Sequence, residues 1–266
     1  MDMTPFEQMP LAAARDIRYI LFDIDDTVTT GGKLTDEAYS AMWDLFRAGY
    51  ALVPVTGRPA GWCDMIIRQW PVEAVVCENG AFALYRDGED VIRTLTHPNA
   101  AANPRPAIEG LCRAVLAAVP GARLARDQFC RVYDAAFDFA EDEPRLPEAA
   151  VEAIMNACAA HGAKYKLSSI HVNAWYGDYD KLSMAQLYFA RAARADDAKK
   201  RVLFFGDSPN DEPMFSYFPN SCGVENVRDF QLKMAVLPTY VTQDRGGAGF
   251  SRAARALIHR TGGCHD

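Results

Sequence analysis

Tyr19-Ile20-Leu21-Phe22-Asp23-Ile24-Asp25-Asp26-Thr27 is the stretch from which the fold can be predicted. Its continuous apolar run is typical of a strand buried on both faces, as in a parallel sheet. The acidic residues come directly after the run, where open α/β sheets place their ligands. Asp23 and Asp25 would point to opposite faces of a continuing strand, so we expect the chain to turn here and bring both carboxylates to one crevice.

The acidic residues of this stretch also predict a metal site. Like charges this close repel one another, so the cluster is costly unless a cation lies among them. Several hard oxygen ligands around a partly hydrated ion suit Mg²⁺. The alternative interpretation is an acidic loop that follows a core strand and binds nothing.

Three further apolar runs end in polar residues. A helix predicted from Thr35 to Ala48 connects the first run to the second, and the resulting strand and helix alternation favours a right-handed parallel sheet. A hydroxyl and a glycine after the second run predict a cradle for an oxyanion, although an ordinary turn would look the same. The runs and their polar ends are Leu52–Val55 with Thr56-Gly57-Arg58, Val72–Cys77 with Glu78-Asn79-Gly80, and Val202–Phe205 with Gly206-Asp207-Ser208-Pro209-Asn210-Asp211.

Residues 83–175 differ from the rest of the chain. Their strands are interrupted by charges, as in half-exposed antiparallel sheets, and two amphipathic helices separate them. We therefore predict an α/β protein with a parallel-sheet core domain, residues 1–82 and 176–266, and an inserted α+β cap domain, residues 83–175. Residues 1–17 are predicted to be a loose lead-in, and 164–173 a single strand.

Composition excludes several classes of function. The 266 residues carry a net charge of −7, so no basic stripe for nucleic acid and no attraction to an anionic membrane are expected. The seven cysteines form no CxxC pair, which favours a reduced cytoplasmic protein without a zinc site. We also expect neither a signal peptide nor a membrane span.

Taken in order, the strand-end residues resemble the four motifs of the haloacid dehalogenase-like phosphohydrolases. The matching residues are Asp23-x-Asp25-x-Thr27, Thr56, Lys181, and Gly206-Asp207-Ser208-x-Asn210-Asp211. The insertion resembles the large cap of the sugar-phosphatase subgroup, which includes trehalose-phosphate, sucrose-phosphate and mannosyl-phosphoglycerate phosphatases. Asn79-Gly80 matches a pair common in that subgroup, whereas Asp26 stands where glycine is commoner.

The resemblance implies a role for each matching residue. Asp23 would be the nucleophile that forms an aspartyl phosphate, and Asp25 the general acid and then the general base. Lys181 would stabilise the transferring group. The implied Mg²⁺ ligands are Asp23, Asp207 and the backbone carbonyl of Asp25, with Asp211 behind them; the implied phosphate-binding residues are Thr56, Gly57, Lys181 and Asn210.

The substrate is predicted to be a small phosphorylated metabolite, in particular a sugar phosphate. In the cap, His171, Asn173 and Trp175 alternate along one predicted strand and share a face. We expect His171 and Asn173 to contact the substrate and Trp175 to pack in a core. Two alternatives are a phosphomutase of the phosphomannomutase type and a non-catalytic phosphate-binding relative, although the latter would be expected to lack an acid. The sequence gives no oligomeric state.

Overall fold

The computed structural model describes residues 3–88, 91–193, 195 and 197–263. A six-stranded sheet runs through the core, and every pairing in it is parallel, as predicted. In spatial order its strands are β1 (Thr4–Pro5), β15 (Tyr240–Val241), β14 (Asn220–Gly223), β13 (Val202–Gly206), β2 (Tyr19–Phe22) and β5 (Ala51–Pro54). Because the strands are parallel, the polar ends of β2, β5 and β13 meet at one edge of the sheet.

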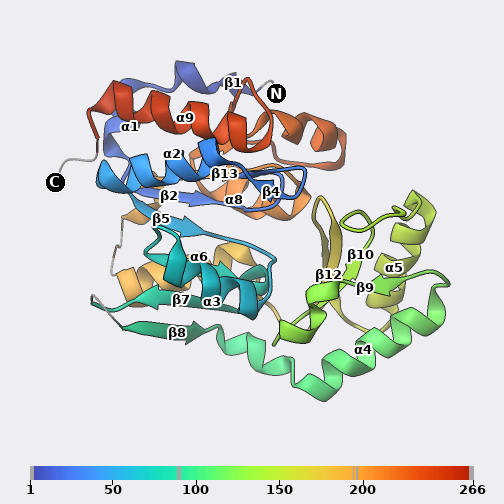
Figure 1. Cartoon of the computed structure of the whole chain (residues 1–266). Helices are drawn as coiled ribbons and strands as arrows, with labels where there is room; N and C mark the ends of the chain where they lie inside the picture. Colours follow the sequence, from blue (N-terminus) through green and yellow to red (C-terminus); the bar gives the residue numbers. More distant parts are fainter. Residues whose placement is uncertain (1–2, 89–90, 194, 196, 264–266) are drawn as a thin grey trace.

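Helices cover both faces of this sheet (Figure 1). Ile20 and Phe22 point to the face covered by α2 and α9, whereas Leu21 points to the face covered by α6 and α8. β2 is therefore buried on both faces, which explains its unbroken apolar sequence. The bounds are α1 (Leu11–Asp16), α2 (Asp36–Arg47), α3 (Ala60–Gln69), α6 (Lys181–Tyr188), α7 (Ala198–Arg201), α8 (Glu212–Tyr217) and α9 (Gly246–Thr261).

The lead-in is more ordered than we predicted. β1 pairs with β15 and forms one edge of the sheet, and α1 contacts α9. Phe6 and Met9 lie between these elements and are each 1% exposed. The apolar contacts of these two side chains hold the N-terminal segment to the core.

A second, three-stranded sheet continues from the core sheet. Val55 and Val76 form a parallel bridge, and antiparallel pairs follow between β6 (Ala74–Cys77), β7 (Phe82–Arg86) and β8 (Ile92–Thr96). The first part of the segment predicted as an insertion thus continues this sheet, because β7 pairs with β6 and β8 pairs with β7. The proposed domain boundaries themselves stay a prediction.

A four-stranded antiparallel sheet with two helices on one face forms the cap (Figure 1). Its strands, in spatial order, are β11 (Lys164–Leu167), β12 (His171–Trp175), β10 (Ala135–Asp138) and β9 (Arg123–Leu124), and its helices are α4 (Arg105–Ala118) and α5 (Glu148–Ala160). The single strand predicted over 164–173 is a hairpin, because the chain reverses at 168–170. The α/β fold with a parallel core and an antiparallel cap sheet is as predicted.

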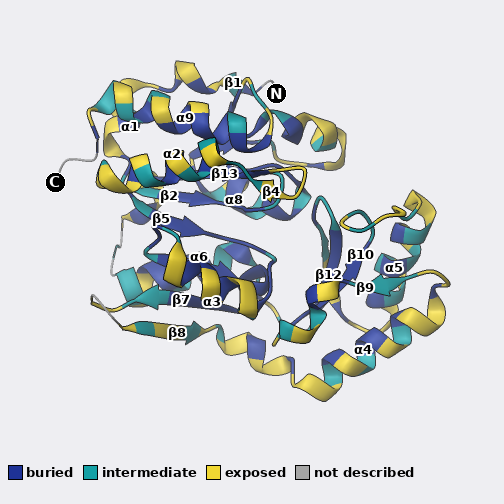
Figure 2. Cartoon of the chain, viewed as in Figure 1, coloured by how far each residue is buried: buried dark blue, intermediate teal, exposed yellow. Residues whose placement is uncertain are grey.

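The remaining elements are short. β3 (Thr29–Thr30) and β4 (Lys33–Leu34) form a hairpin after the acidic stretch. The 3-10 helices are η1 (Phe6–Gln8), η2 (Glu78–Gly80), η3 (Pro98–Ala102), η4 (Arg126–Cys130), η6 (Pro209–Asp211) and η7 (Glu225–Lys233), and η5 (Phe189–Ala193) is a π-helical turn. The strands are the most buried part of the core, whereas exposed residues gather on the outer sides of the helices (Figure 2).

Two further sequence-based expectations concern cysteines and membrane spans. The six cysteines of the described residues are free thiols, and Cys264 lies outside those residues. Within the described ranges, no helix combines the length and apolarity that crossing a membrane requires.

Candidate active site

The acidic stretch turns out of β2 as predicted. The Asp23 N–H still donates to Phe205 O of β13 at 2.9 Å, and a turn follows in which Asp26 has a φ of +56°. A short polar side chain tolerates this left-handed conformation better than most, which accounts for an aspartate at a position where glycine is commoner. The Asn226 amide donates to Asp26 O at 3.0 Å and fixes the turn.

Lys181 lies between two of the acidic residues. Its Nζ is 2.9 Å from Asp23 Oδ2 and 2.7 Å from Asp211 Oδ1, although it is far from both in the sequence. It is the first residue of α6, where Asp180 and Ser183 form a reciprocal capping box. Burial alone would lower the pKa of Lys181, but the charges of Asp211 and Asp23 raise it above its ordinary value. The ammonium group is therefore charged and fixed in position.

Asp207 and Asp211 leave β13 on one tight turn. Asp211 Oδ2 accepts the backbone N–H of Asp207 at 3.0 Å, while its other oxygen holds Lys181. Asp207 Oδ1 accepts the Thr27 hydroxyl at 3.1 Å, and its Oδ2 accepts the Asn226 amide at 3.4 Å. Asp211 thus orients the lysine, while hydrogen bonds from neutral groups orient Asp207.

The charges of this cluster fit a bound cation. Carboxylate oxygens of Asp23, Asp207 and Asp211 lie within 4.8 Å of one another, and all three residues are buried. In the described part of the chain, Lys181 is the cation paired with Asp23 and Asp211, and no cation is paired with Asp207. Burial raises the pKa of Asp23 to about 7 and, with the charges of Asp211 and Asp23, that of Asp207 well above its ordinary value. A divalent cation would offset this excess of buried negative charge.

The predicted oxyanion cradle lies at the end of β5. The Thr56 hydroxyl is buried and accepts the Arg58 N–H at 3.0 Å. A Cβ at Gly57 would lie 3.1 Å from the Asn79 amide group and 3.3 Å from Asn173 Nδ2. The absence of a side chain at Gly57 therefore lets two amide groups, one from the core and one from the cap, approach this turn.

The Asp25 carboxylate is not part of the buried acidic cluster; Arg58 holds it. Arg58 Nε donates to Asp25 Oδ2 at 2.9 Å, and its Nη2 donates to Oδ1 at 2.7 Å. The two acids of the first motif therefore have different partners, Lys181 for Asp23 and Arg58 for Asp25. The contacts of Arg58 extend into the cap, where its side chain meets Glu141 and Asp127.

The cap residues share one face, as predicted. Val172 and Ala174 point into the cap's apolar core, so His171, Asn173 and Trp175 point to the opposite face. His171 Nε2 lies 2.9 Å from Glu141 Oε2, and Asn173 lies against Gly57. Trp175 is 2% exposed and stacks on Tyr179 at 5.6 Å, so it packs in a core as expected.

Asn210 is also buried near the second acidic turn. Its Oδ1 accepts the Ser208 hydroxyl at 2.9 Å. This bond orients the side chain at the start of η6, next to the residues that hold Lys181. Its role toward phosphate stays a prediction.

Two neighbouring cavities lie beside the acidic cluster. The first, of about 280 Å³, is lined by Asp207, Asp26 and Asn226 of the core and by Arg145 and Ser169 of the cap. The second, of about 530 Å³, shares Arg145, Ser169 and Phe230 with the first and has more apolar side chains. Together they give a small molecule room next to the cluster, between core and cap.

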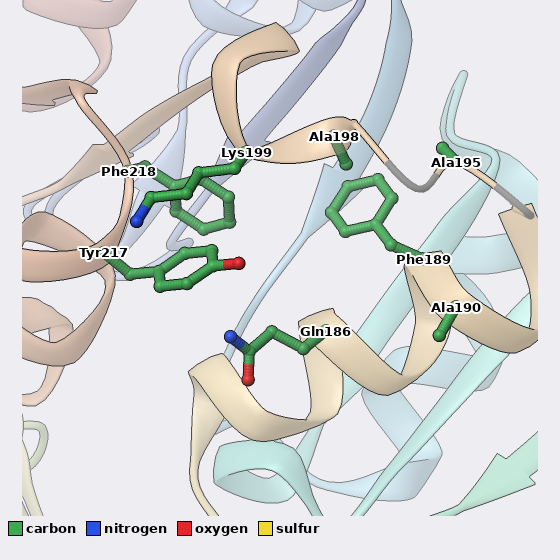
Figure 3. Close-up of a pocket in the computed structure, with 8 residues that line it drawn as sticks. All are labelled: Gln186, Phe189, Ala190, Ala195, Ala198, Lys199, Tyr217 and Phe218. Atoms are coloured by element: carbon green, nitrogen blue, oxygen red, sulfur yellow. The ribbon is translucent and has the colours of Figure 1, made fainter.

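A further cavity, of about 200 Å³, lies among α6, η5 and α8 (Figure 3). Lys199 covers the ring of Tyr217 at 4.3 Å, and Phe189 and Phe218 form much of the wall. None of the residues predicted for catalysis lines it. The acidic cluster is therefore the candidate active site.

Several residues of the site were not predicted from the sequence. Asn226 joins Asp207 to the Asp26 turn, and Glu78 accepts N–H groups from Val132 and Tyr133 of the cap. Asn226 lies in η7 and Glu78 in η2, far in sequence from their partners, so no local spacing could have identified them. Glu78 does belong to a polar strand end, which was a signal for its location if not for its role.

Family and structure comparisons agree with this architecture. Residues 20–103 match the family of haloacid dehalogenase-like hydrolases, which confirms the resemblance seen in the motifs. No curated protein sequence matches the chain.

Three solved structures with similar folds illustrate the structural match. The C-terminal domain of C. albicans trehalose-6-phosphate phosphatase has a TM-score of 0.69 at 13% identity, covering 98% of both chains. The sucrose-phosphatase of Synechocystis sp., determined with sucrose and phosphate, has a TM-score of 0.65 at 13% identity, covering 91% of this chain and 98% of the other. A haloacid dehalogenase-like hydrolase from Bacteroides thetaiotaomicron has a TM-score of 0.66 at 12% identity, with coverage of 91% and 99%. At these identities the likeness shows a shared fold.

Proposed function

We propose that this haloacid dehalogenase-like hydrolase is a Mg²⁺-dependent phosphatase that acts on a phosphorylated sugar or a related small metabolite. The observation that carries the proposal is the buried arrangement of Asp23, Lys181, Asp211 and Asp207 at the carboxyl edge of the sheet. A nucleophilic carboxylate beside a fixed ammonium group suits transfer of a phosphoryl group. Two observations support a sugar phosphate as the substrate class. The chain shares its fold with a sucrose-phosphatase and a trehalose-6-phosphate phosphatase, and cavities lie beneath the cap.

In the first step, an Asp23 oxygen forms a bond to phosphorus while the bond from phosphorus to the leaving oxygen breaks. Asp25 gives its proton to that oxygen, so an alcohol leaves and an aspartyl phosphate remains. Lys181 offsets charge on the phosphoryl oxygens, and the Thr56 hydroxyl with the Gly57 N–H holds one of them.

In the second step, Asp25 takes a proton from water as the water oxygen attacks phosphorus. The bond between phosphorus and Asp23 breaks, which releases phosphate and restores the Asp23 carboxylate. Asp23, Asp207 and the Asp25 carbonyl would hold the Mg²⁺. When bound, the ion neutralises charge on the nucleophile and the phosphoryl group.

The test is a phosphate-release screen over sugar and nucleotide monophosphates. We expect steady release from a subset of sugar phosphates with Mg²⁺, loss of release with excess chelator, and recovery when Mg²⁺ is restored. Sustained release in excess chelator would contradict the metal assignment. A sugar phosphate that is isomerised with little phosphate release would instead identify a mutase.

A further inference from the structure

Arg58 is held on every side in this structure. Its side chain is 4% exposed, and two of its nitrogens donate to the two oxygens of Asp25 at 2.9 and 2.7 Å. The Trp62 ring covers the guanidinium at 4.2 Å. A planar fork of donors can bind a carboxylate in this bidentate way, and a lysine cannot.

The third nitrogen of Arg58 reaches the cap. Nη1 lies 2.7 Å from Glu141 Oε1 and 3.4 Å from Asp127 Oδ2. Burial alone would raise the pKa of Glu141, but the hydrogen bond from His171 and the charge of Arg58 lower it to about 2. Glu141 is therefore a carboxylate that pairs with Arg58 and His171 together.

The loop that carries Glu141 is itself fixed within the cap. Asp138 Oδ1 accepts the backbone N–H groups of Ala140 at 3.0 Å and Glu141 at 2.8 Å. Arg123 of β9 donates to the other oxygen of Asp138 at 2.8 Å. Glu141 is thus fixed to the rest of the cap, and it contacts Arg58 in the arrangement seen here, with the cap lying on the core.

We infer that Arg58 is a positioning residue that couples closure of the cap to the placement of Asp25. This role rests on the proposed function, in which Asp25 donates a proton to the leaving alcohol. Glu141 is the cap residue that contacts Arg58. Arg58 fixes the direction of the Asp25 carboxyl, and Glu141 fixes Arg58. The Asp25 carboxyl is then correctly oriented to donate its proton when the cap covers the site, and not when the cap is raised.

The test uses a series of aryl phosphates from dinitrophenyl to phenyl phosphate. Better leaving groups need less help from a proton donor, so the slope of log kcat/KM against leaving-group pKa reports on Asp25. Since kcat/KM covers the steps up to release of the phenol, the later hydrolysis of the aspartyl phosphate does not affect the slope. The variants are Arg58→Lys, which keeps the charge and removes the fork, and Glu141→Gln. The matched control is Asp178→Asn, which removes another ion pair between cap and core, that of Lys164 with Asp178, away from the cavities beside the cluster.

We expect a steeper slope in both variants, with a loss on phenyl phosphate of ~10-fold to ~100-fold for Arg58→Lys and a smaller loss for Glu141→Gln. Asp178→Asn should follow the wild-type line. A misfolded fraction lowers every point equally, so lines parallel to wild type for Arg58→Lys or Glu141→Gln would overturn the inference. An equal change of slope in Asp178→Asn would also overturn it. If wild-type protein hydrolyses no phosphate ester with Mg²⁺, the proposed function fails instead.

Discussion

At the scale of single residues, Asp23 and Asp25 differ in their partners. They are two residues apart, yet Asp23 is paired with Lys181 in a buried cluster, and Asp25 is paired with Arg58, which also contacts the cap. The separation follows from the turn after β2, since a continued strand would have sent one side chain into the core. Two carboxyls with separate environments can take separate roles.

Single amide substitutions should separate these roles. Asp23→Asn removes the nucleophile, so no phosphoryl-enzyme should form on any substrate. Asp25→Asn keeps the nucleophile, and an activated aryl phosphate hardly needs a proton donor. This variant should release a burst of about one phenol per active site and then turn over slowly, because Asp25 is also needed to activate water. Rapid-quench measurement and the mass of the acid-quenched protein test this, and steady turnover by Asp23→Asn without a burst from Asp25→Asn would reverse the assignment.

Asn173 provides a second test at this scale. The sequence predicts that it contacts the sugar, whereas its amide lies against Gly57, in the turn proposed to bind phosphate. Its Oδ1 is buried and has no hydrogen-bond partner among the described residues, so a bound group could supply one. We expect Asn173→Ala to lower kcat/KM by ~10-fold on both a sugar phosphate and an aryl phosphate, because both carry the phosphoryl group. A loss confined to the sugar phosphate would support the sequence-based role instead.

At the scale of elements, the strands that carry the site could be predicted and the edges of the sheets could not. β2, β5 and β13 are buried on both faces, which produces long apolar runs, and each ends in polar residues. β1 has two residues and no periodicity to detect. The hairpin after β11 was missed because its reversal, Ser168-Ser169-Ile170, contains no glycine, proline or asparagine.

In the candidate site, too, some residues could be predicted from the sequence and others could not. Except for Lys181, which begins α6, the motif residues come directly after core strands, so their meeting at one edge follows from parallel pairing. Arg131 and Glu141 come from loops of the cap and Asn226 comes from η7, so their positions depend on how the cap and η7 pack. Arg131, for example, donates to Gly57 O at 2.8 Å across 74 residues of sequence. Long-range hydrogen bonds of this kind leave no local pattern.

Gly80 packs against the residue that precedes α6. We therefore expect replacement of Gly80 to reduce stability by more than backbone strain alone would, and to reduce activity as well. It has a φ of +104°, and a Cβ there would lie 2.0 Å from Asp180 O, immediately before Lys181. Gly80→Ala should therefore displace the start of α6 and lower kcat as well as the free energy of unfolding, the latter by about 2 kcal/mol or more. Gly121→Ala is the matched control, because Gly121 has a φ of +85° with nothing within 4 Å of its Cβ position. Urea unfolding and kcat measure the effects, and equal losses in the two variants would contradict the argument.

At the scale of the whole molecule, the contacts near the site between core and cap are largely charged. Arg131 and Asp134 of the cap have fully buried side chains and form an ion pair at 3.0 Å, and Asn79 of the core donates to Asp134 at 3.2 Å. Glu78 of the core accepts the backbone N–H of Tyr133 and that of Val132 at 2.9 Å. Directional polar contacts define one closed arrangement of cap and core, but they bury less apolar surface than a continuous core would. This combination suits a cap that opens to exchange substrate and product.

Glu78 makes the stability of this arrangement depend on pH. Burial, with the charge of Asp134, raises the pKa of Glu78 from 4.5 to about 7, against the opposing charge of Arg131 and the cap N–H groups. Between these two values the folded protein keeps a proton that the unfolded chain releases. The contribution of Glu78 to stability is therefore fully present below about pH 4.5 and is lost as pH rises through 7.

Glu78→Gln should remove this dependence, since glutamine cannot ionise. The free energy of unfolding of wild type minus that of the variant should fall by on the order of 1–3 kcal/mol between about pH 5 and pH 8. Urea unfolding across this range measures the difference, and Glu109→Gln, at an exposed position on α4, is the control for which the difference should stay flat. A difference that stays flat for Glu78→Gln, or that grows as pH rises, would show that the N–H donors keep Glu78 ionised in the folded protein. Protonation of Glu78 would then contribute nothing to the stability of the closed arrangement.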